Sequence, residues 1–324
     1  MMEKIPVIIP TITKDYLRMR DIQVNRVLEH LPVKELVFIG NEELCGLVSA
    51  DIAERFDGSP VRTVNEEELV KRQPVVDFVK SRIENMDEEI RKRVRPGWYY
   101  QQFLKMAYSR VCDEEFYMTW DMDTVPLRDV SMFDGDGHPV FDLKREMNPG
   151  YFKTIENLLG LKKEVDGSFV SEHMVFRKDL MTELINAIED SSVKGGDFIE
   201  KIINAVDGDY IALGFSEFET YGTYINHKHP DAYSFRRFSS FRRGSWFLKA
   251  DELNEDDIRW LSEDYDAITF ENAAQIEDMV GLFRNPKYRK SMSAKKFYET
   301  ILESGYFGQY ADGRLIAGDW YAPV

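Results

Sequence analysis

Two aspartates, Asp121 and Asp123, are the side chains in this sequence best placed to do chemistry. They directly follow the apolar run at residues 116–120, which predicts a buried strand. Carboxylates two residues apart at the end of a strand can share one divalent cation, and Mg²⁺ and Mn²⁺ prefer oxygen ligands. A cation held there can neutralise charge that builds up on a leaving phosphate. We therefore expect both aspartates to be metal ligands in a site that suits a nucleoside diphosphate.

The composition narrows the class of protein. The chain has 324 residues and 43% hydrophobic residues, which indicates a globular fold with a sizeable core. It has 42 basic against 58 acidic residues, a formal charge of −16, which opposes nucleic acid or an anionic membrane as the main partner. The two cysteines form no disulfide or zinc pattern. Because no long apolar segment is present, we expect a cytoplasmic protein with at most peripheral membrane contact.

Strands that alternate with helices position the aspartates. This alternation predicts an α/β fold with a mainly parallel sheet that helices cover on both faces. In such sheets ligands bind beyond the carboxyl ends of the strands. Thr11, Gly40 and Asp121 all fall at predicted carboxyl ends, so we expect them at one site. The predicted buried strands cover residues 6–11, 36–40, 61–64 and 116–120.

Three segments, taken together, resemble a known family. They are residues 97–105 (GWYYQQFLK), 120–127 (WDMDTVPL) and 215–222 (FSEFETYG). In order and spacing they resemble nucleotide-sugar-dependent glycosyltransferases of the GT-A fold, and among these the bacterial DUF6492-type proteins. The resemblance implies a Rossmann-like sheet, a UDP- or GDP-linked sugar donor, and Mn²⁺ or Mg²⁺ as cofactor. It also implies transfer to the hydroxyl of a glycan or lipid-linked acceptor, and by analogy a role in bacterial surface glycan synthesis.

The resemblance also implies a domain organisation. Residues 1–245 would form a GT-A-like catalytic domain. Its nucleotide-binding half would be residues 1–130 and its acceptor half residues 131–245. Residues 246–324 would form a C-terminal extension packed on this domain, because no repeat or low-complexity linker separates them.

The metal site that the resemblance implies has four candidate ligands. Asp123 would be the primary ligand, while Asp121 would contact the donor ribose or complete the metal shell. Many GT-A enzymes take a third ligand from a downstream histidine, for which His227 and His229 are candidates. Histidine is a good ligand for Mn²⁺ at neutral pH, where its imidazole is largely neutral. A place in a surface loop is the alternative for both histidines.

Three glutamates are candidates for the catalytic base. Inverting transfer needs a carboxylate that takes the acceptor hydroxyl proton, with a pKa raised by partial burial. We favour Glu217, with Glu219 and Glu172 as further candidates. Glu217 and Glu219 would share a face in a strand but not in a helix. The alternatives are an acceptor-binding carboxylate or a structural ion pair, and retaining transfer would need no such base.

Further polar side chains are candidates for binding the nucleotide sugar. Some follow the first predicted strand, some lie on the helix before residues 116–120, and two belong to an arginine cluster that matches phosphate geometry. For each, a cap, a packed core position or a solvated face is the alternative. These candidates are Thr11, Lys14, Asp15, Gln101, Gln102, Lys105, Arg236 and Arg237, in addition to Asp121.

Two rival functions are compatible with the same motif. In a phosphatase of the haloacid dehalogenase type, Asp121 would be the nucleophile and Asp123 the general acid. That motif normally lies on an early strand, whereas more than a hundred residues precede it here. The second rival is a sugar-nucleotide binder without catalytic activity, which the aromatic content of 13% would suit.

Overall fold

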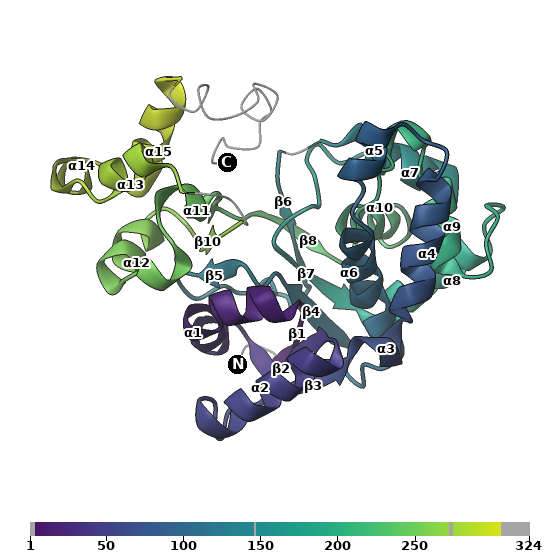
Figure 1. Cartoon of the computed structure of the whole chain (residues 1–324), viewed down its shortest axis with the longest axis horizontal. Helices are drawn as coiled ribbons and strands as arrows, with labels where there is room; N and C mark the ends of the chain where they lie inside the picture. Colours follow the sequence, from purple (N-terminus) through teal and green to yellow (C-terminus); the bar gives the residue numbers. More distant parts are fainter. Residues whose placement is uncertain (1–3, 146, 272–274, 306–324) are drawn as a thin grey trace.

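A five-stranded sheet forms the centre of the molecule (Figure 1). The computed structural model describes residues 4–145, 147–271 and 275–305. In spatial order the strands are β3 (Val61–Asn65), β2 (Val33–Gly40), β1 (Ile5–Pro10), β4 (Phe116–Trp120) and β7 (His173–Arg177). The first four are parallel to one another, and β7 pairs antiparallel with β4. The expected mainly parallel sheet flanked by helices is confirmed.

Helices cover both faces of this sheet and create two hydrophobic cores (Figure 1). Because side chains alternate along a strand, Val7 and Ile9 of β1 belong to one core and Ile8 belongs to the other. The helices α1 (Thr13–His30) and α2 (Glu42–Glu54) pack on the first face. The second face carries α4 (Arg72–Ile83), α6 (Pro96–Ala107), α8 (Lys178–Glu189), α9 (Phe198–Ala205) and α10 (Glu217–Lys228).

Two smaller sheets complete the strands of the described ranges. β10 (Ala267–Thr269) lies between β5 (Thr124–Pro126), to which it is antiparallel, and β9 (Ser240–Phe241), to which it is parallel. β6 (Val140–Leu143) pairs in parallel with β8 (Ser234–Arg237). β10 belongs to residues 246–324, so this C-terminal part supplies a strand directly beside the segment that follows β4.

The remaining helices are short or lie in the C-terminal part. In Figure 1, α12 to α15 lie to the side of the molecule opposite α4 and α9. Within the described ranges, no helix has the length and apolar content of a membrane span. The helices are α3 (Glu66–Leu69), α5 (Glu88–Arg93), α7 (Pro149–Leu159), α11 (Gly244–Phe247), α12 (Glu255–Ser262), α13 (Glu277–Phe283), α14 (Pro286–Ser291) and α15 (Ala294–Glu303), with 3₁₀ turns η1 (Tyr108–Arg110), η2 (Gly208–Tyr210) and η3 (Ala250–Glu252).

Candidate active site

A pocket of about 490 Å³ lies where the carboxyl ends of β1 and β4 meet. Parallel pairing of β1 with β4 brings these two ends to the same edge of the sheet. Five residues predicted from the sequence line this pocket: Thr11, Asp15, Gln101, Asp121 and Asp123. The structure therefore brings the end of β1, the start of α1, one face of α6 and the aspartate pair together.

Backbone hydrogen bonds fix the turn that carries the two aspartates. The Asp121 amide donates to the Glu172 carbonyl at 2.9 Å, which ties the end of β4 to the residue before β7. The Phe270 amide donates to the Asp123 carbonyl at 2.7 Å, which extends the pairing of β10 with β5. Strands from three parts of the chain therefore hold this turn in place, while the two carboxylates line the pocket.

The Asp123 carboxylate lies in an electronegative environment. Burial, and then the charges of Asp121 and Glu271, raise the pKa of Asp123 to about 7, although Arg18 and Arg242 act in the opposite direction. Among the ion pairs of the described ranges, none involves Asp123 within 4.0 Å. A cation placed here would favour the ionised carboxylate.

The donor atoms of the aspartate pair fit Mg²⁺ or Mn²⁺. Both side chains offer only oxygen, which these ions prefer. In the described part of the chain, no group of three or more His, Cys, Asp or Glu side chains is arranged to hold a metal ion. Mg²⁺ is commonly held by one or two carboxylates, with substrate phosphates and water as the other ligands. Asp121 and Asp123 therefore fit a cation that binds together with a diphosphate.

Lys105 connects the pocket to the interior of the protein. Its Nζ lies 3.0 Å from Asp121 Oδ1 and 2.9 Å from Glu217 Oε1. The Lys105 side chain is 5% exposed. Burial disfavours its charge, but the two carboxylates outweigh burial and raise the pKa of Lys105 above its ordinary value. The ammonium is therefore enclosed by carboxylates and holds Asp121 in place.

Glu217 and Glu219 begin a helix, so they do not share a face. Burial raises the pKa of Glu217, although its partner Lys105 acts in the opposite direction. Glu219 accepts hydrogen bonds from Ser168 Oγ at 2.9 Å and from the Phe169 amide at 3.0 Å. Neither carboxylate lines the pocket, but Glu217 is connected to Asp121 through Lys105.

Glu172, the third candidate base, lies in a paired and buried position. It accepts a hydrogen bond of 2.7 Å from Ser240 Oγ and lies 3.3 Å from Lys144 Nζ. Burial disfavours its charge, yet Lys144 and then Arg242 outweigh burial and lower the pKa of Glu172 to about 2. Its carboxylate therefore stays ionised down to acidic pH, and it does not line the pocket around Asp123.

Arg236 takes part in a buried network rather than in the pocket. Its Nε and Nη2 each donate to the Asp142 carboxylate at 2.8 Å. His173 Nε2 lies 2.7 Å from the same carboxylate, and its ring stacks on Trp120 with centroids 4.8 Å apart. Although burial opposes ionisation, Arg236 and His173 lower the pKa of Asp142 to about 2.

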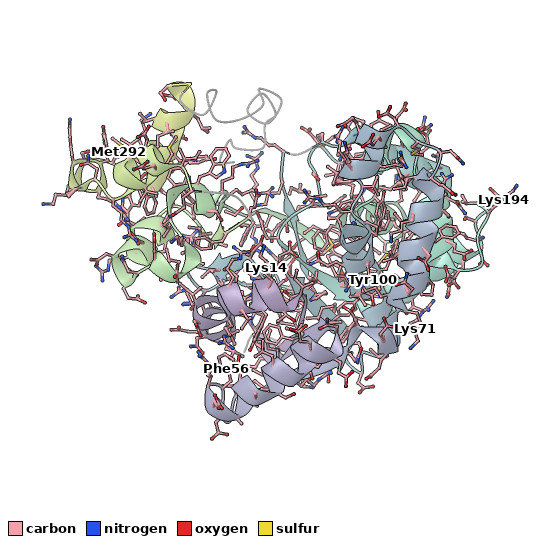
Figure 2. The ribbon with its side chains drawn as sticks, viewed as in Figure 1. Lys14, Phe56, Lys71, Tyr100, Lys194 and Met292 are labelled. Atoms are coloured by element: carbon pink, nitrogen blue, oxygen red, sulfur yellow. The ribbon has the colours of Figure 1, made fainter. Side chains whose placement is uncertain are left out.

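The other predicted residues lie outside the pocket. Lys14 is exposed on the first turn of α1, where Figure 2 labels it, and Arg237 is exposed on β8. Gln102 is buried, and its Oε1 accepts a 3.1 Å hydrogen bond from the Glu217 amide. His227 Nε2 lies 2.7 Å from the Lys162 carbonyl oxygen, and His229 Nε2 lies 3.0 Å from both Glu183 carboxylate oxygens. The structure does not bring either histidine to the aspartate pair.

Comparison with known proteins places the chain in a family. A profile described as "Family of unknown function (DUF6492)" matches residues 2–283. The chain belongs to this family. The family expected from the three sequence segments is thereby confirmed. No curated protein sequence matches the chain.

Several solved structures are similar to this DUF6492 protein at low sequence identity. Mouse xyloside xylosyltransferase 1, in its apo form, is 13% identical with a TM-score of 0.42, covering 85% of this chain and 100% of that one. The galactosyltransferase LgtC, in complex with donor and acceptor sugar analogues, is 14% identical with a TM-score of 0.41, covering 91% and 94%. The bifunctional glycosyltransferase WbbM, also apo, is 13% identical with a TM-score of 0.44, covering 92% and 51%.

Sequence reasoning missed three arginines that line the pocket of this DUF6492 protein. Arg18, Arg72 and Arg95 line the pocket beside Tyr100, which Figure 2 labels on α6. Arg18 lies one helical turn beyond the predicted residue Asp15, so helical spacing could have revealed it. Arg72 and Arg95 reach the pocket from helices and connections that only the folded structure brings together.

Proposed function

We propose that this protein is a metal-dependent glycosyltransferase that moves a sugar from a UDP- or GDP-linked donor to an acceptor hydroxyl. The observation that carries this proposal is the pocket at the carboxyl ends of β1 and β4, which contains both carboxylates of Asp121 and Asp123. Its volume of about 490 Å³ falls within the range of small-molecule sites. Because Asp123 has a raised pKa and no ion pair among those described, it favours a cationic ligand.

Residues that line the pocket and residues behind it divide the work of such a reaction. Asp123 and Asp121 would hold Mn²⁺ or Mg²⁺, which neutralises charge on the leaving diphosphate. Lys105 keeps Asp121 in place from the interior. For inverting transfer we propose Glu217 as the base, because it is connected to Asp121 through Lys105 and its pKa is raised, as a base near neutral pH requires.

The partners follow from composition and from the sequence resemblance. We propose a glycan or lipid-linked acceptor, a cytoplasmic location and a role in bacterial surface glycan synthesis. A formal charge of −16 supports the expectation that nucleic acid is not a partner.

A thermal-shift screen of nucleotide sugars with and without Mn²⁺ tests the proposed function. At a hundred times Kd, a ligand stabilises the folded state by about 2.7 kcal/mol, which raises the Tm of a chain of this length by about 4 °C. We expect such a rise with one UDP- or GDP-linked donor, only when Mn²⁺ is present. The rise should vanish in Asp123→Ala and persist in Asp113→Ala, an exposed aspartate before the opposite end of β4.

The same samples separate the rival functions. A phosphatase would hydrolyse a generic aryl phosphate and lose that activity in Asp121→Asn. A binder without catalytic activity would be stabilised by the donor but would show neither sugar transfer nor slow donor hydrolysis. Stabilisation by the donor without Mn²⁺, unchanged in Asp123→Ala, would contradict the proposed function.

A further inference from the structure

Arg18 lines the same pocket as Asp121 and Asp123 but has no role in the proposal above. It lies on the second turn of α1. Its Nη1 donates to the Phe270 carbonyl at 2.7 Å, and its Nη2 lies 3.4 Å from Asp15 Oδ1. A guanidinium group has five N–H donors, so these two contacts leave donors available. The side chain is 29% exposed, which leaves part of it accessible from the pocket.

Two other cations near the pocket, Lys105 and Arg72, are placed differently. The Lys105 ammonium is enclosed by two carboxylates. Arg72 Nη1 lies 3.4 Å from Glu66 Oε1, and its guanidinium lies over the Tyr100 ring at 5.7 Å. Of the arginines that line the pocket in the described ranges, Arg18 is the one whose charge acts on Asp123. Arg18 is therefore the arginine of the pocket whose charge reaches the metal-ligand candidate Asp123.

The charge of the pocket shows why an anionic ligand needs this residue. Four carboxylates line the pocket together with three arginines, in a chain with a formal charge of −16; the carboxylates are those of Asp15, Glu66, Asp121 and Asp123. A diphosphate entering such a pocket meets several negative charges, and one divalent ion compensates only part of them. A planar guanidinium binds two phosphate oxygens at once, and its charge is less screened in a pocket than on an open surface.

We propose that Arg18 binds the diphosphate of the donor, beside the aspartate pair. This inference rests on the proposed function, because it takes a nucleoside diphosphate group as the ligand. It assigns to Arg18 the phosphate contact that the sequence suggested for Lys105, Arg236 and Arg237. The contact to the Phe270 carbonyl fixes the arginine against the segment after β10 and so orients it before the ligand arrives.

Isothermal titration calorimetry with Mn²⁺ present tests this role. The ligands are UDP and GDP, with uridine and guanosine as matched ligands that lack the diphosphate. The variants are Arg18→Met, Arg18→Lys and the control Arg26→Met. Arg26 is a suitable control because it lies on the same helix and its Nε and Nη2 donate to the Pro126 and Leu127 carbonyls at 2.6 and 2.9 Å. It does not line the pocket.

We expect Arg18→Met to weaken binding of the preferred diphosphate about tenfold or more, as loss of a charged hydrogen-bonding partner does. Its affinity for the matching nucleoside should not change. Arg18→Lys should lose less affinity for the diphosphate, because lysine keeps the positive charge but cannot donate to two phosphate oxygens with a planar guanidinium. Arg26→Met should bind the diphosphate as the wild type does. If Arg18→Met does not fold, the role of Arg18 is tested by comparing the diphosphate affinity of Arg18→Lys with that of Arg26→Met. A weaker affinity in Arg18→Lys alone supports the role.

Two outcomes would overturn the assignment of Arg18. One is unchanged diphosphate affinity in Arg18→Met. The other is an equal loss of affinity in the Arg18 and Arg26 variants, which would indicate a general effect of losing a carbonyl contact. A wild-type protein that binds neither UDP nor GDP would instead contradict the proposed function itself, so the two failures are distinguishable.

Discussion

Asp123 and Asp142 are aspartates of one chain in opposite electrostatic surroundings. Asp142 accepts two hydrogen bonds from Arg236, and His173 Nε2 lies 2.7 Å from its carboxylate. These two neighbours outweigh burial and lower the pKa of Asp142 to about 2. Asp123 has carboxylate neighbours, which add to burial and raise its pKa to about 7. A compensated carboxylate stabilises the fold, whereas an uncompensated one in a pocket marks a place for a positively charged ligand.

Lys105 joins Asp121, which lines the pocket, to the buried carboxylate of Glu217. Its loss should have the largest effect on stability. Lys105→Met leaves Glu217 buried without its partner and removes the contact to Asp121. We expect the free energy of unfolding to fall by about 3–5 kcal/mol. Urea unfolding followed by circular dichroism measures the loss.

A second variant checks the cause of that loss. Lys105→Met combined with Glu217→Gln removes both charges, so it should recover part of the stability. If the double variant is as unstable as the sum of the two single variants, the ion pair is not what stabilises this part of the protein.

Loss of the Asp142 carboxylate should destabilise the paired region somewhat less. Asp142→Ala removes the carboxylate that Arg236 and His173 share, but Arg236 keeps its hydrogen bond to the Ser131 carbonyl and is 30% exposed, so it can be solvated in part. We expect a loss of about 3 kcal/mol in the free energy of unfolding. Asp113→Ala, which removes an exposed aspartate outside this network, serves as the control. An equal effect of the two substitutions would contradict the distinction between paired and unpaired carboxylates.

Acid should weaken the paired region. Asp142 and Glu172 have lowered pKa values in the folded state, so each contributes stability that is fully present above its ordinary pKa near 4. This contribution is lost as the pH falls toward 2, and for Asp142 it amounts to about 2 kcal/mol. Glu172→Gln should therefore make the free energy of unfolding fall less steeply between pH 4 and 2 than in the wild type. If the free energy of unfolding of Glu172→Gln falls as steeply between pH 4 and 2 as that of the wild type, the ionised Glu172 carboxylate does not stabilise the fold.

Asp123→Asn should have the smallest effect on stability. It removes a charge that has carboxylate neighbours and no ion pair among those described, so we expect a change within about 1 kcal/mol, in the stabilising direction at pH 7. Chemical denaturation without divalent ions measures it. A loss as large as that of Asp142→Ala would show that Asp123 is a structural residue.

Features set by local sequence were predicted correctly. The run of apolar residues before Asp121 predicted β4 at residues 116–120 with its observed bounds. The pairing of strand ends then followed from the alternation of strands and helices. This was enough to bring Thr11 and Asp121 to one pocket, whereas Gly40, which was expected at the same site, does not line it.

Features that depend on distant pairing were not predictable. The sequence allowed either a strand or a helix for Glu217 and Glu219, and the helix begins there because Ser216 caps it. Pairing of β10 with β5 brings residues about 145 positions apart together, so nothing near Asp123 indicated that Glu271 acts on it. Which cations are enclosed by carboxylates also depends on side chains from separate elements, as at Lys105.

Electron paramagnetic resonance of Mn²⁺ tests the central claim most directly. Free Mn²⁺ is titrated with protein, with and without UDP or GDP, in the wild type and in Asp123→Asn. We predict that the wild type binds Mn²⁺ together with one of the diphosphates and that Asp123→Asn, although folded, does not. Equal Mn²⁺ binding in the two proteins, or none in the wild type with either diphosphate, would contradict a metal site at Asp121 and Asp123.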